Sequence, residues 1–141
     1  MKSFSFRDVS LFVQGTEITG YDEGDDVILL SRVNDSASDV VGADSKMTVF
    51  LSEDLSGTVT FRLQSTSDSN AFMSSLMSNQ ENGLFVPIFA MFKDNRNNDL
   101  GYGSQGYIPR PASFGAGNRT QPREWIVKVE RLDLLHLGED V

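Results

Sequence analysis

The spacing of apolar side chains along most of the chain is that of β-strands. Val9, Leu11 and Val13 recur at every second position, which is the pattern of a strand with one buried face. Phe4 and Phe6 alternate in the opposite register, just before this run. A change of one residue in the register of an alternating run predicts a β-bulge between the two parts.

Three further segments extend the strand pattern. Gln14-Gly15 predicts a tight turn, and residues 17–19 predict the strand that returns from it. Residues 22–26 are acidic and glycine-containing, so they predict a charged turn. Residues 27–33 are rich in apolar side chains, and we expect a strand that is buried on both faces.

The middle of the chain predicts a β-hairpin. Residues 34–45 are rich in Ser, Asp and Gly and predict a loop. Residues 46–51 and 57–64 form the two arms of the predicted hairpin, joined by residues 52–56. In the second arm, apolar side chains alternate with polar ones, so one face points to a core and the other to a polar environment. The core positions are Val59, Phe61 and Leu63, and the polar positions are Thr58, Thr60, Arg62 and Gln64.

One helix is predicted, over residues 68–81. Ser67 or Asp68 can cap its start, and Asn82-Gly83 ends it. Its apolar side chains fall on one stripe, which we expect to pack on the sheet; they are Phe72, Met73, Leu76 and Met77. The apolar residues 84–92 that follow contain Pro87, which predicts an edge strand or a bulged one.

A long polar and glycine-rich stretch, residues 94–107, predicts a functional loop. It contains the letters G-x-G-x-x-G, but Pro109 and Pro111 follow, so the helix that a dinucleotide site requires cannot form there. The last strands are predicted at residues 105–109, 125–129 and 132–135. Trp125 opens an alternating run and is expected in the core.

These elements predict a single domain over residues 1–141 that is mainly β. The expected architecture is an antiparallel β-barrel or β-sandwich with one flanking α-helix. The core is expected to contain Phe61, Phe72, Leu76, Trp125 and Val127.

The sequence argues against an enzyme and against a cofactor or metal site. It contains no cysteine, and His136 is its one histidine, so no convergent catalytic set is evident. The acidic turn that starts at Asp22 does not fit an EF-hand, because the twelfth position of such a loop would be Val33 rather than Glu. The net charge of −8 disfavours nucleic-acid binding. No run is apolar enough to span a membrane, and no secretory signal pattern opens the sequence, so we expect a soluble, unprocessed chain.

Three segments carry a resemblance to a known family. The first comprises residues 4–11 and 18–27, and the second is the predicted helix with residues 83–87 after it. The third runs from Gly106-Tyr107-Ile108-Pro109-Arg110-Pro111 to the Arg123-Glu124-Trp125-Ile126-Val127 run. Together these segments resemble the tail tube proteins of contractile-tailed bacteriophages.

The resemblance implies a structural role without cofactors. Tail tube proteins are β-barrel-like subunits that form hexameric rings, and the rings stack into a hollow tube inside a contractile sheath. The lumen conducts DNA during genome ejection. The implied partners are other copies of the chain, the sheath, the tape-measure protein and the baseplate, while DNA passes without specific binding. The implied location is the virion, after assembly in the host cytoplasm.

If the chain is a tube protein, its residues can be assigned to the lumen wall, to contacts between rings and to the side that faces the sheath. The predicted hairpin is a candidate for the lumen wall, with Glu53, Asp54, Thr58, Thr60, Arg62 and Gln64 lining it. The N-terminal strands over residues 4–19 are an alternative wall, and the sequence does not choose between them. The candidate ring-to-ring contacts are Asp35, Asp39 and Asp44 in one polar segment and Asp94, Arg96 and Asp99 in the other. The polar face of the helix is expected to face the sheath.

Two alternatives remain open. The chain resembles tube proteins of type VI secretion systems and pyocins in its implied fold, so it could belong to such a device. It could also be a monomeric β-sandwich that binds a carbohydrate through the glycine-rich loop. A tube protein is expected to form rings or filaments, whereas a carbohydrate-binding module is expected to be a monomer.

Overall fold

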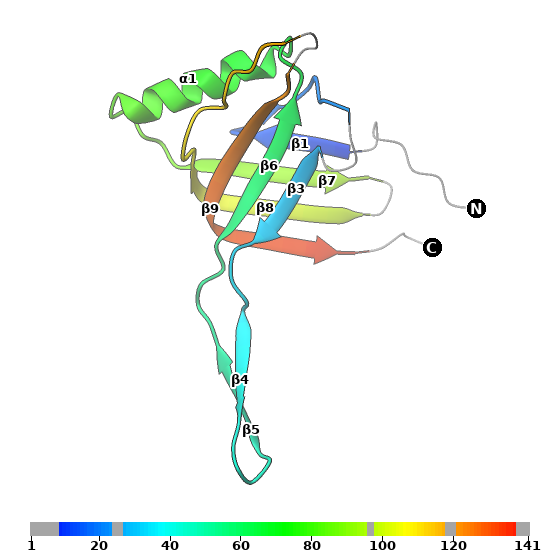
Figure 1. Ribbon diagram of the computed structural model, residues 1–141, viewed down its shortest axis with the longest axis vertical. Coiled ribbons are helices and arrows are strands. Elements are labelled where there is room, and N and C mark those ends of the chain that lie inside the picture. The colour runs from blue at the N-terminus through cyan, green and yellow to red at the C-terminus, as the bar shows by residue number, and fades with distance from the viewer. Residues whose placement is uncertain (1–8, 24–26, 96–97, 118–120, 138–141) are drawn as a thin grey trace, which may run out of the picture.

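A computed structural model describes residues 9–23, 27–95, 98–117 and 121–137. The described residues form nine strands and one helix (Figure 1). The strands are β1 (Val9–Val13), β2 (Thr16–Glu17), β3 (Ile28–Arg32), β4 (Ala37–Val41), β5 (Met47–Leu51), β6 (Gly57–Leu63), β7 (Ile88–Asp94), β8 (Asp99–Tyr107) and β9 (Arg123–His136), and the helix is α1 (Ser69–Glu81).

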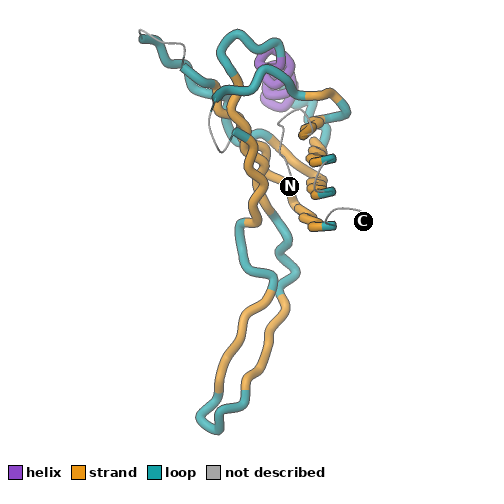
Figure 2. The backbone as a smooth tube through the Cα atoms, turned by 90° about the vertical axis from the view of Figure 1, so that its right-hand side faces the viewer, coloured by secondary structure: helices purple, strands orange, loops and turns teal. Residues whose placement is uncertain are grey.

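Seven strands form one antiparallel sheet in the order β2-β1-β7-β8-β9-β6-β3. β9 joins the two halves of this sheet, since its residues 123–129 pair with β6 and its residues 128–136 pair with β8. The sheet therefore folds into two layers (Figure 2). The first layer contains β3, β6 and the start of β9, and the second contains β1, β7, β8 and the end of β9. The prediction of a mainly β, antiparallel fold with one helix is confirmed, in a sandwich-like form.

The core lies between the two layers and under the helix. Val59, Phe61 and Leu63 of β6 are fully buried, as the alternation predicted. Trp125 and Val127 of β9 are buried beside them. From α1, Met73 and Met77 enter the core, whereas Phe72 and Leu76 are half-buried and pack against its edge.

Side-chain bonds to the body of the fold hold α1 near both of its ends. At its start, the Ser69 hydroxyl accepts a hydrogen bond from the Thr19 amide at 3.0 Å. Near its end, the Gln80 side chain makes two bonds to the backbone of Ile108, of 2.7 and 3.0 Å. The predicted stop is confirmed, because Asn82 is the C-cap and Gly83 adopts a φ of 83°. Asp68 is the N-cap residue, but its side chain makes no capping bond. This 13-residue helix, the one in the described part of the chain, is not long and apolar enough to cross a membrane.

The predicted pairing of residues 46–51 with residues 57–64 is wrong. β5 pairs with β4, which lies inside the predicted loop of residues 34–45, while β6 pairs with β3 and β9. The reason is that residues 52–56 do not turn back but run on into the sheet, where the Leu55 carbonyl accepts a bond from the Leu132 amide. β4 and β5 thus form a separate hairpin that projects from the sandwich (Figure 1).

The predicted glycine-rich loop is also wrong over most of its length, because residues 99–107 form the central strand β8. Its glycines face the packed interior. A Cβ at Gly101 would lie 2.6 Å from Cδ2 of Leu30, and one at Gly103 would lie 2.8 Å from Cγ1 of Val129. Glycine therefore occupies these positions because the neighbouring layers leave no room for a side chain.

Three smaller predictions have mixed outcomes. β7 is an inner strand and not an edge strand, and where its register with β8 shifts between Ile88 and Ala90, the extra residue lies in β8 and not in β7. β3 is not buried on both faces, since it lies at the end of the sheet and Leu29 is 51% exposed. The two predicted C-terminal segments form one continuous strand, β9. The predicted bulge at residues 7–8 lies outside the described residues, as does most of the acidic turn.

Candidate assembly surfaces

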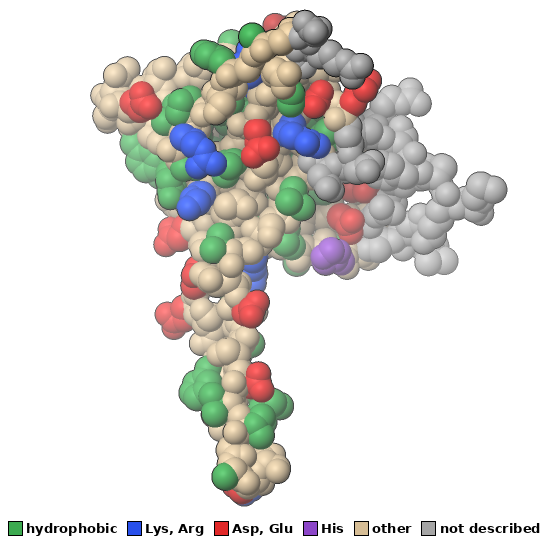
Figure 3. All heavy atoms as spheres, viewed as in Figure 1, with side chains coloured by type: hydrophobic (Ala, Val, Ile, Leu, Met, Phe, Trp, Pro, Cys, Tyr) green, Lys and Arg blue, Asp and Glu red, His purple; other side chains and the backbone are tan. Residues whose placement is uncertain are grey.

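The hairpin of β4 and β5, which we call the arm, carries the most unusual surface of the molecule. It extends away from the sandwich in both views of the backbone (Figures 1 and 2). Every residue of both strands is exposed, and apolar side chains lie along them (Figure 3). A two-stranded hairpin is marginally stable on its own in water. Within the described part of the chain, no other segment covers the arm.

The two faces of the arm differ in composition. Residues directly opposite each other in an antiparallel pair point to the same face. One face therefore combines the pairs Ala37–Leu51, Asp39–Val49 and Val41–Met47, and Asp39 is its one charged residue. The other face combines Ser38–Phe50 and Val40–Thr48. Leu51 is 82% exposed, and Val41 and Met47 are each 60% exposed. The first face is the more apolar, which is typical of a surface that becomes buried on assembly.

A group of short polar bonds holds the base of the arm. The Asn34 amide donates to Oδ2 of Asp54 at 2.6 Å, and the Ser56 hydroxyl donates to Oδ1 at 2.6 Å. The Ser56 amide donates to the same oxygen at 3.1 Å. These bonds, those from Ser56 first, lower the pKa of Asp54 below its usual value. The candidate lumen residues Glu53 and Asp54 thus lie at the root of the arm and not in the sheet.

The other candidate lumen residues lie together on the first layer. Thr58, Thr60 and Arg62 alternate along the outer face of β6, where each is half-buried, and Gln64 follows the strand in an exposed position. On the neighbouring strand, Glu124 lies opposite Arg62. The segment after Pro109 runs beside this face. It lines a pocket together with Glu124 and Ile126, and the Ser113 carbonyl accepts a bond from Arg123.

The second layer has a more regular outer face, which includes the N-terminal strand β1. The strand register aligns residues of β1, β7, β8 and β9 in rows across this face. One row consists of Ser10, Lys93, Leu100 and Leu135. The next row is Phe12, Met91, Tyr102 and Asp133. Phe89 and Tyr102 stack on this face, with ring centroids 6.5 Å apart. The sequence did not predict the β8 residues of this face, because the polar, glycine-rich residues 94–107 have the composition of a loop.

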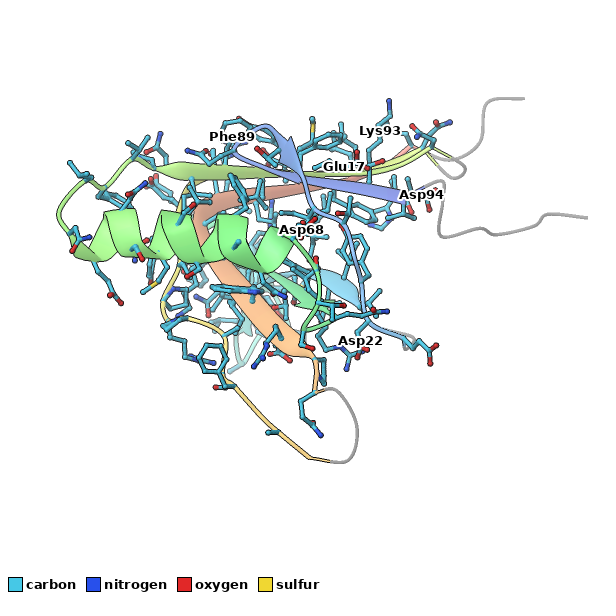
Figure 4. The ribbon with its side chains drawn as sticks, turned by 90° about the horizontal axis from the view of Figure 1, so that it is seen from above. Glu17, Asp22, Asp68, Phe89, Lys93 and Asp94 are labelled. Atoms are coloured by element: carbon cyan, nitrogen blue, oxygen red, sulfur yellow. The ribbon has the colours of Figure 1, made fainter. Side chains whose placement is uncertain are left out.

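The candidate ring-to-ring residues fall into two separate groups. Asp35, Asp39 and Asp44 are exposed at or along the arm. Asp94 and Asp99 face each other at the end of the β7–β8 pair, on another side of the molecule. Lys93 points away from the sheet, whereas Asp94 turns toward its inner side (Figure 4), and Asp94 is 5% exposed. Arg96 lies outside the described residues.

Within the described part of the chain, the large sheet has open strand edges at β3 and along the end of β9. β3 ends the sheet and pairs with β6 on one side alone. Residues 130–136 of β9 extend past the end of β6 and pair with β8. On their other side, Leu132 bonds to the Leu55 carbonyl and to Nε of Arg32. Open strand edges are templates for pairing with further strands.

The described residues show no cluster of three or more metal-ligating side chains. The His136 side chain is 85% exposed, and its Nδ1 lies 3.8 Å from a carboxylate oxygen of Asp99. Such an exposed pair contributes little to stability.

The model of the bacteriophage PhiTE tail tube protein family matches residues 1–135 of this sequence. The chain belongs to this family. A curated relative, structural protein ORF10 of Pseudomonas phage KPP10, is 26% identical over 123 residues, which are 86% of this chain and 70% of the relative. This tail tube protein is therefore a structural component of a phage tail, and it is not an enzyme.

Solved structures show the same fold at low sequence identity. The sheath/tube terminator of an extracellular contractile injection system has a TM-score of 0.61 and 11% identity, covering 96% of this chain and 98% of that one. The cap that terminates the tube of the anti-feeding prophage has a TM-score of 0.61 and 10% identity, covering 96% and 93%. A sheath–tube complex of the injection system gives 0.55 at 12% identity, covering 92% and 88%.

Proposed function

We propose that this tail tube protein forms hexameric rings that stack into the hollow tube of a contractile phage tail, and that DNA passes through the lumen during genome ejection. The observation that carries the proposal is the arm. Its apolar residues are exposed in a single chain and need a surface from another copy. The family match and the phage relative favour a phage tail over a secretion system or a pyocin.

Assembly from identical copies also accounts for the open edges. Strands that add to β3 or to the end of β9 would satisfy backbone groups that have no strand partner among the described residues. The arm and these edges are different surfaces, so contacts between them are heterologous and generate rings or stacks by repetition. A monomeric carbohydrate-binding module is less well supported, because the loop assigned to its ligand is the central strand β8.

We place the lumen wall on the outer face of β1, β7, β8 and β9. This face is a regular array of strands, and one of its borders is the open end of β9. The polar row of β6, with Thr58, Thr60 and Arg62, is the rival wall. The segment after Pro109 runs beside that row and would interrupt a continuous lining. The net charge of −8 favours passage of DNA without binding, because like charges repel.

The remaining partners follow from the same proposal. The outer face of α1, with Ala71, Ser74, Ser75 and Ser78, is exposed and suits contact with a sheath. The arm acids Asp35, Asp39 and Asp44, together with Asp99, are proposed to lie at contacts between rings. The tape-measure protein would occupy the lumen and the baseplate would start the tube. Assembly would take place in the host cytoplasm, before the tail joins the virion.

Negative-stain electron microscopy of the purified protein, combined with sedimentation, tests this proposal. We expect rings or hollow filaments with six-fold end views. A chain that stays monomeric at high concentration, and that does not elongate purified baseplates, would contradict it. Rings with another symmetry would retain the tube and correct the number of subunits.

A further inference from the structure

An apolar groove opens between the two layers at the side where β3 faces the end of β9. Its volume is about 200 Å³, and apolar side chains dominate its lining. Ile28 and Leu30 come from β3, Phe92 from β7, and Leu134 from β9. Gly101 lies beside them, within contact distance of Leu30 and Leu134 for any added Cβ. Ligand sites usually measure about 300–1,000 Å³, so this groove suits a few aliphatic side chains better than a free ligand.

The groove is bordered by a backbone edge that can pair. The Arg62 amide bonds to the Val27 carbonyl and the Val33 amide bonds to the Ser56 carbonyl, so odd-numbered residues of β3 direct their backbone groups at β6. Backbone groups alternate in direction along an antiparallel strand. Those of Ile28 and Leu30 therefore point away from β6, along the side where the groove opens. An extended strand with apolar side chains at every second position would fit both features.

We infer that β5 of a second copy of this chain adds to the β3 edge and places Met47, Val49 and Leu51 in the groove. These three residues have the required spacing of two, lie on the more apolar face of the arm, and are each more than half exposed. β5 also has an open edge of its own, because the arm contains two strands. Strand addition of this kind draws affinity from backbone bonds and specificity from alternate side chains.

The occupant is a second copy because the arm projects away from the sandwich of its own chain (Figure 2). The charges beside the two surfaces are complementary, since the positively charged Lys46 precedes Met47 on the arm and the negatively charged Asp99 lines the groove. The contact rests on the proposed assembly into rings and tubes, and it names the surfaces that join one copy to the next. Because arm and groove differ, each copy uses both, so the contact propagates.

Cross-linking between two single-cysteine variants tests the contact. The native chain contains no cysteine, so each introduced thiol is unique. Val49→Cys and Leu134→Cys proteins are mixed, assembled and oxidised mildly. We expect a disulfide-linked dimer that requires both variants and disappears on reduction. Val49→Cys mixed with Ser74→Cys is the matched control, because Ser74 lies exposed on α1, away from the groove. Each variant alone is the second control.

Electron microscopy of the same samples distinguishes a failure of the arm-to-groove contact from a failure of the tube proposal. Rings or tubes without the mixed disulfide would overturn the arm-to-groove contact and leave the tube proposal intact. An equal yield from the Val49→Cys and Ser74→Cys mixture would also overturn it. Protein that gives neither assemblies nor the mixed disulfide, even when purified baseplates are added, would overturn both proposals.

Discussion

Trp125 and Asn70 tie the start of β9 to the first turn of α1. Nε1 of the Trp125 indole donates a hydrogen bond of 2.9 Å to Oδ1 of Asn70, and the Asn70 amide nitrogen donates to the Gln64 carbonyl at 2.8 Å. Trp125 is 4% exposed, so its N–H has little access to water. One amide side chain thus satisfies a buried indole and fixes the link between β6 and the helix.

Replacing Asn70 should destabilise the fold. Asn70→Ala would leave the indole N–H buried without its acceptor, at a cost of about 1–3 kcal/mol in the free energy of unfolding. Urea denaturation followed by Trp fluorescence measures this change. Asn79→Ala is the control, because Asn79 is exposed on the same helix and its side chain makes no hydrogen bond to the described residues. Equal stability of the two variants would show that water replaces the Asn70 bond.

The buried glycines of β8 lead to a second prediction. Gly103→Ala would place a Cβ 2.8 Å from Cγ1 of Val129, and such overpacking costs about 1–3 kcal/mol. Adding Val129→Ala removes the clashing methyl groups, so the double variant should be less destabilised than the sum of the single variants. Thermal unfolding of the four proteins measures this coupling.

Gly106 should behave differently in the same experiment. A Cβ there would lie 2.7 Å from the Ile88 carbonyl oxygen, 2.9 Å from Cγ1 of Val129 and 3.0 Å from the Lys128 carbonyl oxygen, and Val129→Ala removes only the contact with Val129. The Gly106→Ala variant should therefore be rescued less than Gly103→Ala, because its two clashes with backbone oxygens remain. Gly117→Ala is the control, since the nearest atom there is 3.8 Å away. Equal rescue of Gly106→Ala and Gly103→Ala by Val129→Ala would mean that the backbone yields at Gly106.

The same glycines explain why part of the fold could not be predicted from sequence. β6 and α1 each bury apolar side chains against the core, so the period of burial is visible in the sequence. β8 is equally central, but Gly101 and Gly103 occupy its inner positions, and glycine-rich polar sequence is typical of loops. The spacing of two between Gly101 and Gly103 was the available signal.

The arm was missed for a different reason. Apolar and polar residues alternate along a strand when one face is buried in the domain and the other is exposed. A strand with both faces exposed has no such alternation in its sequence. β4 begins with Ala37, Ser38 and Asp39, which resemble a loop, and its apolar Val40 and Val41 have no partner in the sandwich. If another copy buries the arm, as proposed, its pattern of apolar residues reflects that contact and not the packing of a single chain.

The Asp54 bonds at the base of the arm predict a pH dependence. A carboxyl with a lowered pKa keeps its hydrogen bonds above that pKa and loses them when the pH falls through it. In an NMR titration, the amide proton of Ser56 should therefore shift with a midpoint below 3.8, the usual value for Asp. Asp54→Asn should abolish the transition. A midpoint at or above 3.8 would contradict the bonding seen at this site.

The two candidate lumen walls can be separated by the size of a thiol reagent. In assembled tubes, a cysteine on the lumen wall should react with a small maleimide but not with a bulky polyethylene-glycol maleimide. We expect this selectivity for Ser104→Cys, on the outer face of β8, and not for Thr60→Cys on β6. Both variants should react with both reagents after disassembly. The reverse selectivity would assign the wall to β6, with Thr58, Thr60 and Arg62.

Charges placed on the arm should abolish assembly without unfolding the protein. Val49→Asp combined with Leu51→Asp changes two side chains that are 55% and 82% exposed, and such surface changes are usually within about 0.5 kcal/mol of neutral. If assembly buries this face, two unpaired carboxylates in an apolar contact should prevent it. Sedimentation velocity should then show monomers, with an unfolding transition like that of the native chain. Ser74→Asp with Ser78→Asp adds the same charge to the exposed face of α1, and tubes should still form. Tubes of normal length from the arm variant would show that the arm stays in water after assembly, and the apolar face of β4 and β5 would then need another explanation.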